Sequence, residues 1–360
     1  MRRPGRTLPT CLVAILTIAS TACSGDTQTP RSRDVKSTSS TTTHVLTGVT
    51  RTRLVSECPQ VQPPWSQTGK YAPFFGSERR VVWLPTAAGR CLYELRPGAE
   101  TARAIWKADA ETAVSGVMWS PANEQLLLTV RGSKGDAVER LDANGQSLAT
   151  IAARSATWTT SGQVVIQRST GLFLVTRSGL KKIISTTALE DAAGFAGRPN
   201  SIGEDTLGYE RGAGDSAVAV TWSSSTPPRE VTLVVGLDGA VARATPVFRG
   251  TGSRAGGVGG LSWSPDGRQL YLLLKAPTPQ GFSYDHDHCV MRWDRSIGFR
   301  TTFCMTDLPQ RYRHHFDKLI WSADGSRGLL NDGTVINHDG EPLSHLRAKP
   351  TWGAFSAHWK

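Results

Sequence analysis

The chain has 360 residues, of which 41 are Lys or Arg and 30 are Asp or Glu, so its formal net charge is +11 at pH 7. No dense basic run and no aromatic RNA-binding motif accompanies this charge, which argues against nucleic acid as the partner. Beyond the N-terminus, no stretch approaches the roughly 20 apolar residues that a transmembrane helix needs. We therefore expect neither a nucleic-acid-binding protein nor an integral membrane protein.

Residues 1–22 have the features of an export signal peptide. Three arginines precede a short apolar run, which ends in small residues before Cys23. The sequence "STAC" at 20–23 resembles the lipobox of bacterial lipoproteins, in which the Cys becomes the lipid-modified first residue of the mature chain. This resemblance predicts a protein anchored through Cys23 to the outer face of the bacterial cell membrane. An ordinary secretory signal with a coincidental Cys is the alternative.

Residues 23–55 are rich in Ser and Thr and have almost no large apolar side chains before Val45. Such a segment cannot bury enough surface to fold alone, so we interpret it as a flexible tether. The folded domain is predicted to span residues 56–360.

A repeated strand–turn–strand pattern organises this domain. In each copy the first strand ends in Trp, and a turn built on Asp, Asn, Ser or Gly leads into a second, apolar strand. A second hairpin with a Gly-containing turn follows, so the repeating unit has four strands, named a, b, c and d. The spacing of the repeated Trp residues brackets the period of propeller blades. Copies lie at 116–130, 155–167, 261–274 and 318–332, with a degenerate copy at 206–222 in which Tyr209 replaces Trp.

The Trp-Ser-Pro-Asp-Gly turn at residues 263–267 resembles the blades of TolB-like and related WD-repeat-like bacterial propeller proteins. The resemblance covers about residues 79–360. It implies an all-β protein, a six-bladed β-propeller of four-stranded antiparallel blades. It extends to the architecture alone, because the α/β domain that precedes the propeller in TolB has no counterpart in this sequence.

The first and last units are incomplete in a complementary way. The first unit has b, c and d strands but no clear a strand, whereas residues 351–358 form an a strand with nothing after it. We therefore predict that the C-terminal strand completes blade 1, which would remove an exposed sheet edge. The alternative takes an a strand from the segment around Trp65, although the stretch that follows contains Pro73, which a central strand tolerates poorly.

The two faces of the predicted propeller differ in loop length. The a–b turns are short, whereas several b–c and d–a connections are long, and binding residues concentrate on long loops. Two of the long loops carry four of the eight His residues. His286, His288, His314 and His315 are therefore candidate ligands of a divalent transition metal. No zinc-type spacing supports this site, so solvated polar loops or a proton-sensitive patch are the alternatives, and no other cofactor is predicted.

Four Cys residues remain in the predicted mature domain, an even number for an oxidising compartment. In an antiparallel hairpin, opposed residues have a constant index sum. Cys289 and Cys304 would then face each other across a turn centred just after Ser296, at a Cα separation of about 4.5 to 5.5 Å. By elimination, Cys58 pairs with Cys91. The alternative is four buried free thiols.

The sequence has no Gly-x-Ser-x-Gly elbow and no phosphate-binding loop. We therefore expect a non-catalytic binding or scaffold module that holds a protein or an envelope polymer on its long-loop face. The alternative is an exported metal-dependent hydrolase or lyase that uses the His cluster. A sensor or assembly factor is the third class of function.

Overall fold

The structure is a computed structural model. The predicted signal peptide, Cys23 and the tether up to residue 54 lie outside the residues that it describes. Among the described helices, none is long and apolar enough to cross a membrane. The described residues are 55–63, 69–75, 80–84, 90–120, 124–133, 135–158, 162–199, 207–210, 217–225, 228–249, 257–264, 268–275, 288–294, 296–309, 316, 319–322, 324–346 and 355–358.

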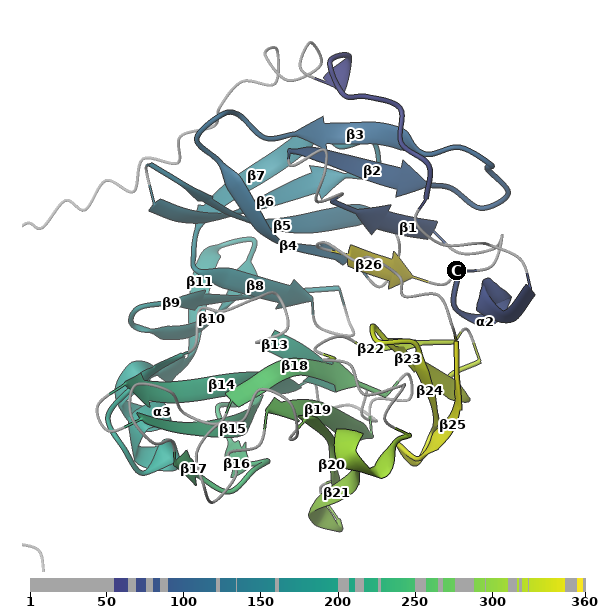
Figure 1. The fold of residues 1–360 in the computed structure, drawn as a ribbon. Helices are drawn as coiled ribbons and strands as arrows, with labels where there is room; N and C mark the ends of the chain where they lie inside the picture. The colour runs from purple at the N-terminus through teal and green to yellow at the C-terminus, as the bar shows by residue number, and fades with distance from the viewer. Residues whose placement is uncertain are drawn as a thin grey trace, which may run out of the picture. The chain divides into compact units, whose positions relative to one another are not determined.

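Six antiparallel sheets make up a six-bladed β-propeller, as the repeat predicts (Figure 1). In blade 1 the strands a to d are β26 (Phe355–His358), β1 (Arg80–Trp83), β2 (Cys91–Leu95) and β3 (Arg103–Lys107). Blade 2 has β4 (Ala113–Trp119), β5 (Gln125–Gly132), β6 (Gly135–Asp142) and β7 (Ser147–Ala152), and blade 3 has β8 (Ser155–Trp158), β9 (Val164–Arg168), β10 (Gly171–Thr176) and β11 (Gly179–Ser185).

The second half of the chain continues the same arrangement. Each a strand from β26 to β22 contacts the a strand of the next blade. Blade 4 has β13 (Leu207–Glu210), β14 (Ala217–Ser225), β15 (Pro228–Gly236) and β16 (Val241–Arg243), extended by the short strands β12 (Arg198–Pro199) and β17 (Phe248–Arg249). Blade 5 has β18 (Gly257–Trp263), β19 (Gln269–Lys275), β20 (His288–Asp294) and β21 (Gly298–Cys304), and blade 6 has β22 (Leu319–Trp321), β23 (Arg327–Leu330), β24 (Thr334–Asn337) and β25 (Pro342–His345).

The serine of the repeated Trp-Ser turn holds strands a and b together. In blade 5, the Ser264 N–H donates to the Gln269 carbonyl oxygen at 2.8 Å, and the Ser264 Oγ accepts from the Gln269 N–H at 3.0 Å. Ser120 and Ser322 accept the equivalent bonds in blades 2 and 6, at 3.1 and 3.0 Å. Because a buried hydroxyl needs a partner, this local bond explains why Ser follows Trp in these copies.

Each interface between neighbouring blades has an apolar cluster of its own. The repeated Trp residues lie in these clusters and are almost fully buried, with exposed fractions of 4% for Trp119, 2% for Trp158, 9% for Trp263 and 7% for Trp321. The repeated Trp residues therefore provide packing between blades. The repeat signature therefore encodes the core.

The first described segments and the last described strand meet at the interface between blades 6 and 1. The C-terminal strand β26 pairs antiparallel with β1, with Ala357 opposite Val81. Trp65, in the segment considered as a rival a strand, lies outside the described residues, and the stretch that follows it is helical: η1 (Gly69–Tyr71) and α2 (Ala72–Phe75). Pro73 suits this position, because the first turn of a helix needs no N–H from it.

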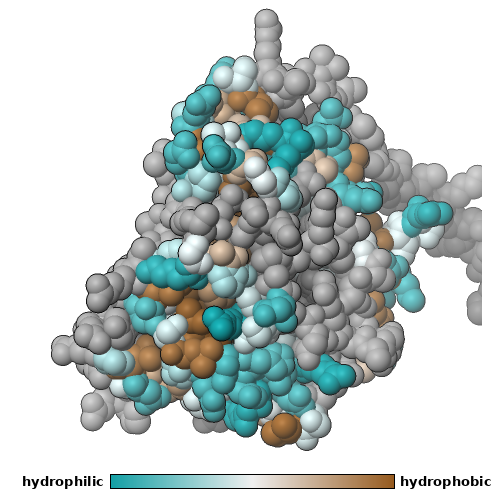
Figure 2. Space-filling view, turned by 90° about the vertical axis from the view of Figure 1, so that its right-hand side faces the viewer, coloured by the Kyte–Doolittle hydropathy of each residue, from teal (hydrophilic) through white to brown (hydrophobic). Residues whose placement is uncertain are grey.

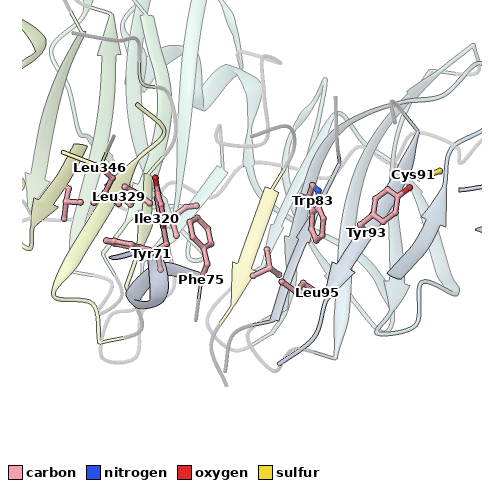
Figure 3. Packing of buried hydrophobic residues seen from close by; sticks show 12 residues of the cluster. Tyr71, Phe75, Trp83, Cys91, Tyr93, Leu95, Ile320, Leu329 and Leu346 are labelled. Atoms are coloured by element: carbon pink, nitrogen blue, oxygen red, sulfur yellow. The ribbon is translucent and has the colours of Figure 1, made fainter. Parts of the chain in front are cut away.

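The short helical segment fills the space between the two blades (Figure 3). Tyr71 and Phe75 lie beside Ile320 of blade 6, and the cluster continues to Trp83 of blade 1. Phe74 and Phe75 are 1% and 0% exposed. This segment acts as an apolar filler at the junction of the first and last blades.

The connections between blades depart from the predicted pattern in two places. Part of the expected long loop at 186–205 forms a helix, α3 (Thr186–Ala193), which the Ser185 side chain caps by accepting from the Ala188 N–H. Only two or three residues separate strands b and c in blades 2, 3, 4 and 6, and a Gly at positive φ lies in this connection or directly after it in three of these blades: Gly135, Gly171 and Gly333. A Gly backbone allows so tight a turn, so the contrast in loop length rests mainly on the d–a connections and on the β19–β20 segment.

Candidate functional site

Two disulfides strengthen the face that carries the b–c and d–a connections, called the long-loop face below. Cys58 is bonded to Cys91 at the start of β2, with a Cα–Cα distance of 6.0 Å. Cys289, near the start of β20, is bonded to Cys304 at the end of β21, with a Cα–Cα distance of 3.9 Å. Both bonds therefore lie at the same face, on the blades that flank blade 6.

Cys289 and Cys304 are paired as the sequence predicts, but the hairpin turn is not centred where a constant index sum would place it. Asp294 pairs with Gly298, so the turn is centred on Ser296, and a β-bulge shifts the register by one residue before the two Cys residues are reached. The extra residue is Thr302, whose Oγ1 donates to the Val290 carbonyl oxygen at 2.8 Å. The 3.9 Å separation of the Cys Cα atoms is shorter than the roughly 4.5 to 5.5 Å expected for an opposed pair.

The predicted His cluster falls largely outside the described residues. The backbone of His288 begins β20, whereas His286, His314 and His315 are not described. The described residues contain no group of three or more His, Cys, Asp or Glu side chains that could hold a metal ion. The Cys289–Cys304 bond does join the bases of the two segments that contain these His residues.

Charged side chains form ion pairs at the long-loop face. Lys107 Nζ lies 2.5 Å from the Glu57 carboxylate, which links blade 1 to the segment that precedes it. In blade 2, Arg131 lies 3.6 Å from Asp136 across the β5–β6 turn. These exposed pairs add little stability, because solvent screens them, but they make the described part of this face polar.

The opposite face carries the a–b and c–d turns, and here neighbouring blades contact each other through glycines. A Cβ atom at Gly145 would lie 1.8 Å from the Ile105 carbonyl oxygen of blade 1. Gly239 stands in the same relation to Ile183 of blade 3 at 2.9 Å, and Gly340 approaches Thr302 of blade 5 equally closely. The c–d turns of blades 2, 4 and 6 thus pack directly on strand d of the preceding blade.

Two of these packed interfaces also have ion pairs at their outer edges. In blade 1, Glu94 is fully buried and Arg103 Nε donates to its carboxylate at 2.7 Å, while the Arg103 guanidinium reaches Asn144 of blade 2 at 3.4 Å. Between blades 5 and 6, the 5% exposed Arg292 donates to Asp339 at 2.6 Å. A buried charge needs such partners, so these contacts fix how the two blades meet.

The three remaining interfaces lack this glycine contact. A Cβ atom at Gly98, Gly179 or Gly298 would meet no heavy atom of the described residues within 4 Å. We call the interfaces between blades 2 and 3, 4 and 5, and 6 and 1 the open interfaces. The exposed large apolar side chains of the described residues are Leu148, Leu180, Ile297 and Leu343.

Figure 2 shows the side of the molecule that lies to the right in Figure 1. On its described surface, hydrophilic residues predominate and hydrophobic residues form small groups between them. Scattered apolar groups of this kind are ordinary for a soluble surface.

Blade 3 has basic side chains but no acidic ones, a pattern that the search for dense basic runs did not detect. Between Asp142 and Glu190 the chain has no acidic residue. The described ion pairs include none of the basic side chains in this interval. A count of charge along the chain, rather than a search for dense basic runs, would have found it. The basic residues are Arg154, Arg168, Arg177, Lys181 and Lys182.

Two carboxylates at the face that carries the a–b and c–d turns are held in their charged form. Hydrogen bonds from Ser322 and from Ser326 lower the pKa of Asp324 to about 2. The Ser296 side chain, followed by the backbone N–H groups of Ser296 and Ile297, lowers the pKa of Asp294. These shifts reflect turn geometry, because donors converge on one carboxylate, and no second titratable group is involved in the hydrogen bonds.

Comparison with known proteins assigns the chain to no family. No protein-family model matches the chain, and no curated protein does. It is similar to crystal structures of TolB from Acinetobacter baumannii, with 15% identity and a TM-score of 0.45 over 79% of this chain and 68% of that chain. A putative TolB from Agrobacterium tumefaciens has 12% identity and a TM-score of 0.40 over 78% and 97% of the two chains. A functionally unknown protein from Desulfotomaculum acetoxidans has 10% identity and a TM-score of 0.46 over 75% and 83%.

Proposed function

We propose that this protein is an extracytoplasmic binding or scaffold module, anchored to the outer face of the cell membrane through a lipid on Cys23. Its long-loop face would hold a partner protein or an envelope polymer. The observation that carries the proposal is the pair of disulfides on blades 1 and 5. Disulfides persist in oxidising compartments, and both of these reinforce the same face.

The geometry supports binding by a rigid surface. The Cys289–Cys304 bond closes an outer hairpin at the base of a long connection, and the Cys58–Cys91 bond ties the segment before blade 1 to β2. A partner that binds there therefore meets a face that loses little conformational freedom. Ion pairs such as Lys107–Glu57 make this face polar, which suits a reversible interface more than an obligate one.

Lipid anchoring is tested by replacing the modified residue. The Cys23→Ala variant should either be released from the membrane fraction or accumulate as an unprocessed precursor. Normal processing together with unchanged membrane attachment would show that the signal is not a lipobox.

The binding face is tested by site-specific photo-crosslinking in cells. A photoreactive residue at Ser133 or Thr306 samples the long-loop face, and one at Glu124 or Ser326 samples the opposite face as the matched control. The proposal requires a discrete adduct from the first pair that the control pair does not form. Adducts from the control positions alone would place the partner on the other face.

A metal-dependent hydrolase or lyase is the second candidate function. It is supported by the Cys289–Cys304 bond, which joins the bases of the two segments that contain the four His residues. In that case the exported chain should contain stoichiometric metal. His286→Ala combined with His288→Ala should remove the metal, whereas His338→Ala combined with His345→Ala, both in blade 6, should not. Metal-free wild-type protein after metal incubation would remove this candidate.

A further inference from the structure

We propose that the open interface between blades 2 and 3 binds an acidic, partly apolar segment of a partner protein. This surface lies toward the a–b and c–d turns, so it is distinct from the long-loop face. Its two components are a group of apolar side chains left partly exposed and a set of basic side chains without carboxylate partners.

The apolar component comes from both blades. Ile151 of blade 2 and Phe173 and Val175 of blade 3 are partly buried and pack against one shared cluster. Val175 is paired with Leu180, and directly paired residues in an antiparallel sheet point to the same face. Leu180 therefore faces blade 2, with 37% of its surface exposed.

Leu148 adds exposed apolar surface on the blade 2 side. It is the extra residue of a β-bulge in β7, between Ser147 and Ala149, and is 49% exposed. In blade 1 the equivalent bulge residue is Ile105, and the Gly145 turn of blade 2 packs on it. Because blade 3 provides no such contact, Leu148 stays accessible to a partner.

The basic component follows from the same pairing. Lys182 is paired with Phe173 and therefore also faces blade 2, with its Nζ 5.7 Å from the Phe173 ring centre. Arg140 of β6 lies two residues from Val138, a member of the shared cluster, so it faces blade 3. Arg177 is exposed in the β10–β11 turn nearby.

Basic side chains predominate on this surface: Arg140, Arg177 and Lys182 face one carboxylate, Asp142, which lies two residues from Arg140 on β6. None of the described ion pairs involves these three basic side chains, and the chain has no acidic residue between Asp142 and Glu190. At the neighbouring interface between blades 1 and 2, in contrast, Glu94 forms ion pairs with Arg96 and Arg103. The positive potential therefore attracts a negatively charged segment.

The mixture of side chains favours a peptide over a purely ionic polymer. Leu148 and Leu180 offer apolar contact that a polymer of charged groups cannot use, whereas a peptide can alternate acidic and apolar side chains. We therefore assign a protein segment with Glu or Asp next to Leu, Ile or Phe as the ligand.

The test uses the mature chain without its lipid, residues 24–360, and a fluorescent peptide in which Glu and Leu alternate. Fluorescence anisotropy should detect binding that weakens as salt rises, because the attraction between charges is screened. The double variant Leu180→Ser with Lys182→Glu should raise the dissociation constant about tenfold or more, because it removes an apolar contact and reverses a charge. The matched control, Leu343→Ser with Arg327→Glu in blade 6, should leave it unchanged.

A second variant, Arg177→Glu, keeps the test interpretable if the double variant fails to fold, because Arg177 is exposed in a turn. Absence of binding by the wild-type chain, or equal weakening in the blade 6 control, would overturn the proposal. Poly-L-glutamate or vesicles of phosphatidylglycerol that bind as tightly as the peptide would overturn it too, and would assign the surface to an anionic polymer or a membrane. These outcomes are independent of the cross-links expected at the long-loop face.

Discussion

The Gly145 backbone in the β6–β7 turn lies directly against the carbonyl oxygen of Ile105 in the neighbouring blade. Its φ of +84° is unfavourable for other residues, and a Cβ atom would lie 1.8 Å from that oxygen. Gly239 of blade 4 lies in the same way against the Ile183 carbonyl oxygen of blade 3, and Gly340 of blade 6 lies against the Thr302 side chain of blade 5. Glycine turns therefore join the blades in three close pairs.

Replacing Gly145 should therefore cost more than the left-handed backbone alone explains. Gly298→Ala, at a φ of +81° with open space around it, should lower the free energy of unfolding by about 1 to 2 kcal/mol. Gly145→Ala should lower it by about 3 kcal/mol or more, because backbone atoms of two blades must also separate. Denaturant unfolding of both variants measures the difference, and equal losses would show that the turn does not press on blade 1.

The disulfides should stabilise the folded state through the unfolded chain. Cys289→Ser with Cys304→Ser opens a link between residues 15 apart and should cost about 3 kcal/mol, whereas opening the Cys58–Cys91 link, 33 residues apart, should cost about 4 kcal/mol. Thiol labelling of denatured, unreduced protein should find none of the four thiols. A mass spectrum that links Cys58 to Cys289 would contradict the pairing.

Asp324 should make stability depend on pH in the acidic range. Its folded pKa of about 2 is below the usual 3.8, because Ser322 and Ser326 donate to the carboxylate. A lowered pKa contributes stability that is fully present above the unfolded pKa and is lost as pH falls through the folded pKa. The stability difference between wild type and Asp324→Asn should therefore shrink between about pH 5 and pH 2, and a difference that is constant with pH would argue against this bond.

The C-terminal strand should be required for a stable propeller. Deleting residues 355–360 removes the partner of Val81 and leaves β1 as a free edge next to the cluster around Phe75. We expect a lower melting temperature and concentration-dependent light scattering, since an uncovered strand edge promotes aggregation. Deleting only residues 359–360 is the control, and equal behaviour of the two truncations would contradict the prediction.

The blade number was readable from the sequence because the signature is local. The Ser264 hydroxyl accepts a hydrogen bond from a backbone N–H five residues away, and Trp263 packs within the neighbouring interface. Each copy of the signature therefore specifies one blade through contacts close to it. The fold class follows from counting such copies. The Cys289–Cys304 pair was readable for a similar reason, since a hairpin sets which residues are opposed, and the Cys58–Cys91 pair then followed by elimination.

Other features depend on tertiary contacts that no local pattern contains. The bulge at Thr302 moves the centre of the blade 5 turn, and the Gly340 turn of blade 6 packs on that residue. The segment 69–75 is helical because it fills a space that exists only between assembled blades. In contrast, the ends of α3 are visible in the sequence, because Ser185 is a typical N-cap residue and Gly194 a typical C-cap residue.

The candidate binding surfaces were only partly accessible to sequence reasoning. Loop length indicates one face, and three of the four candidate His residues, His286, His314 and His315, lie outside the described residues. The surface between blades 2 and 3 depends on which side of a strand Leu180 and Lys182 face, and that is fixed by the register of β10 and β11. The absence of acidic residues between Asp142 and Glu190 is visible in the sequence, but the register is needed to show which basic side chains share one surface.

The pairing of β1 with β26 sets an order of events during biosynthesis. The ribosome delivers β1 long before β26, and at about 5 to 20 residues per second the delay amounts to tens of seconds. Throughout that time β26 does not cover the edge of β1, and blade 6 does not cover the aromatic side chains of Tyr71 and Phe75. Until β26 is available, the uncovered strand edge and aromatic side chains are a surface that a chaperone can bind.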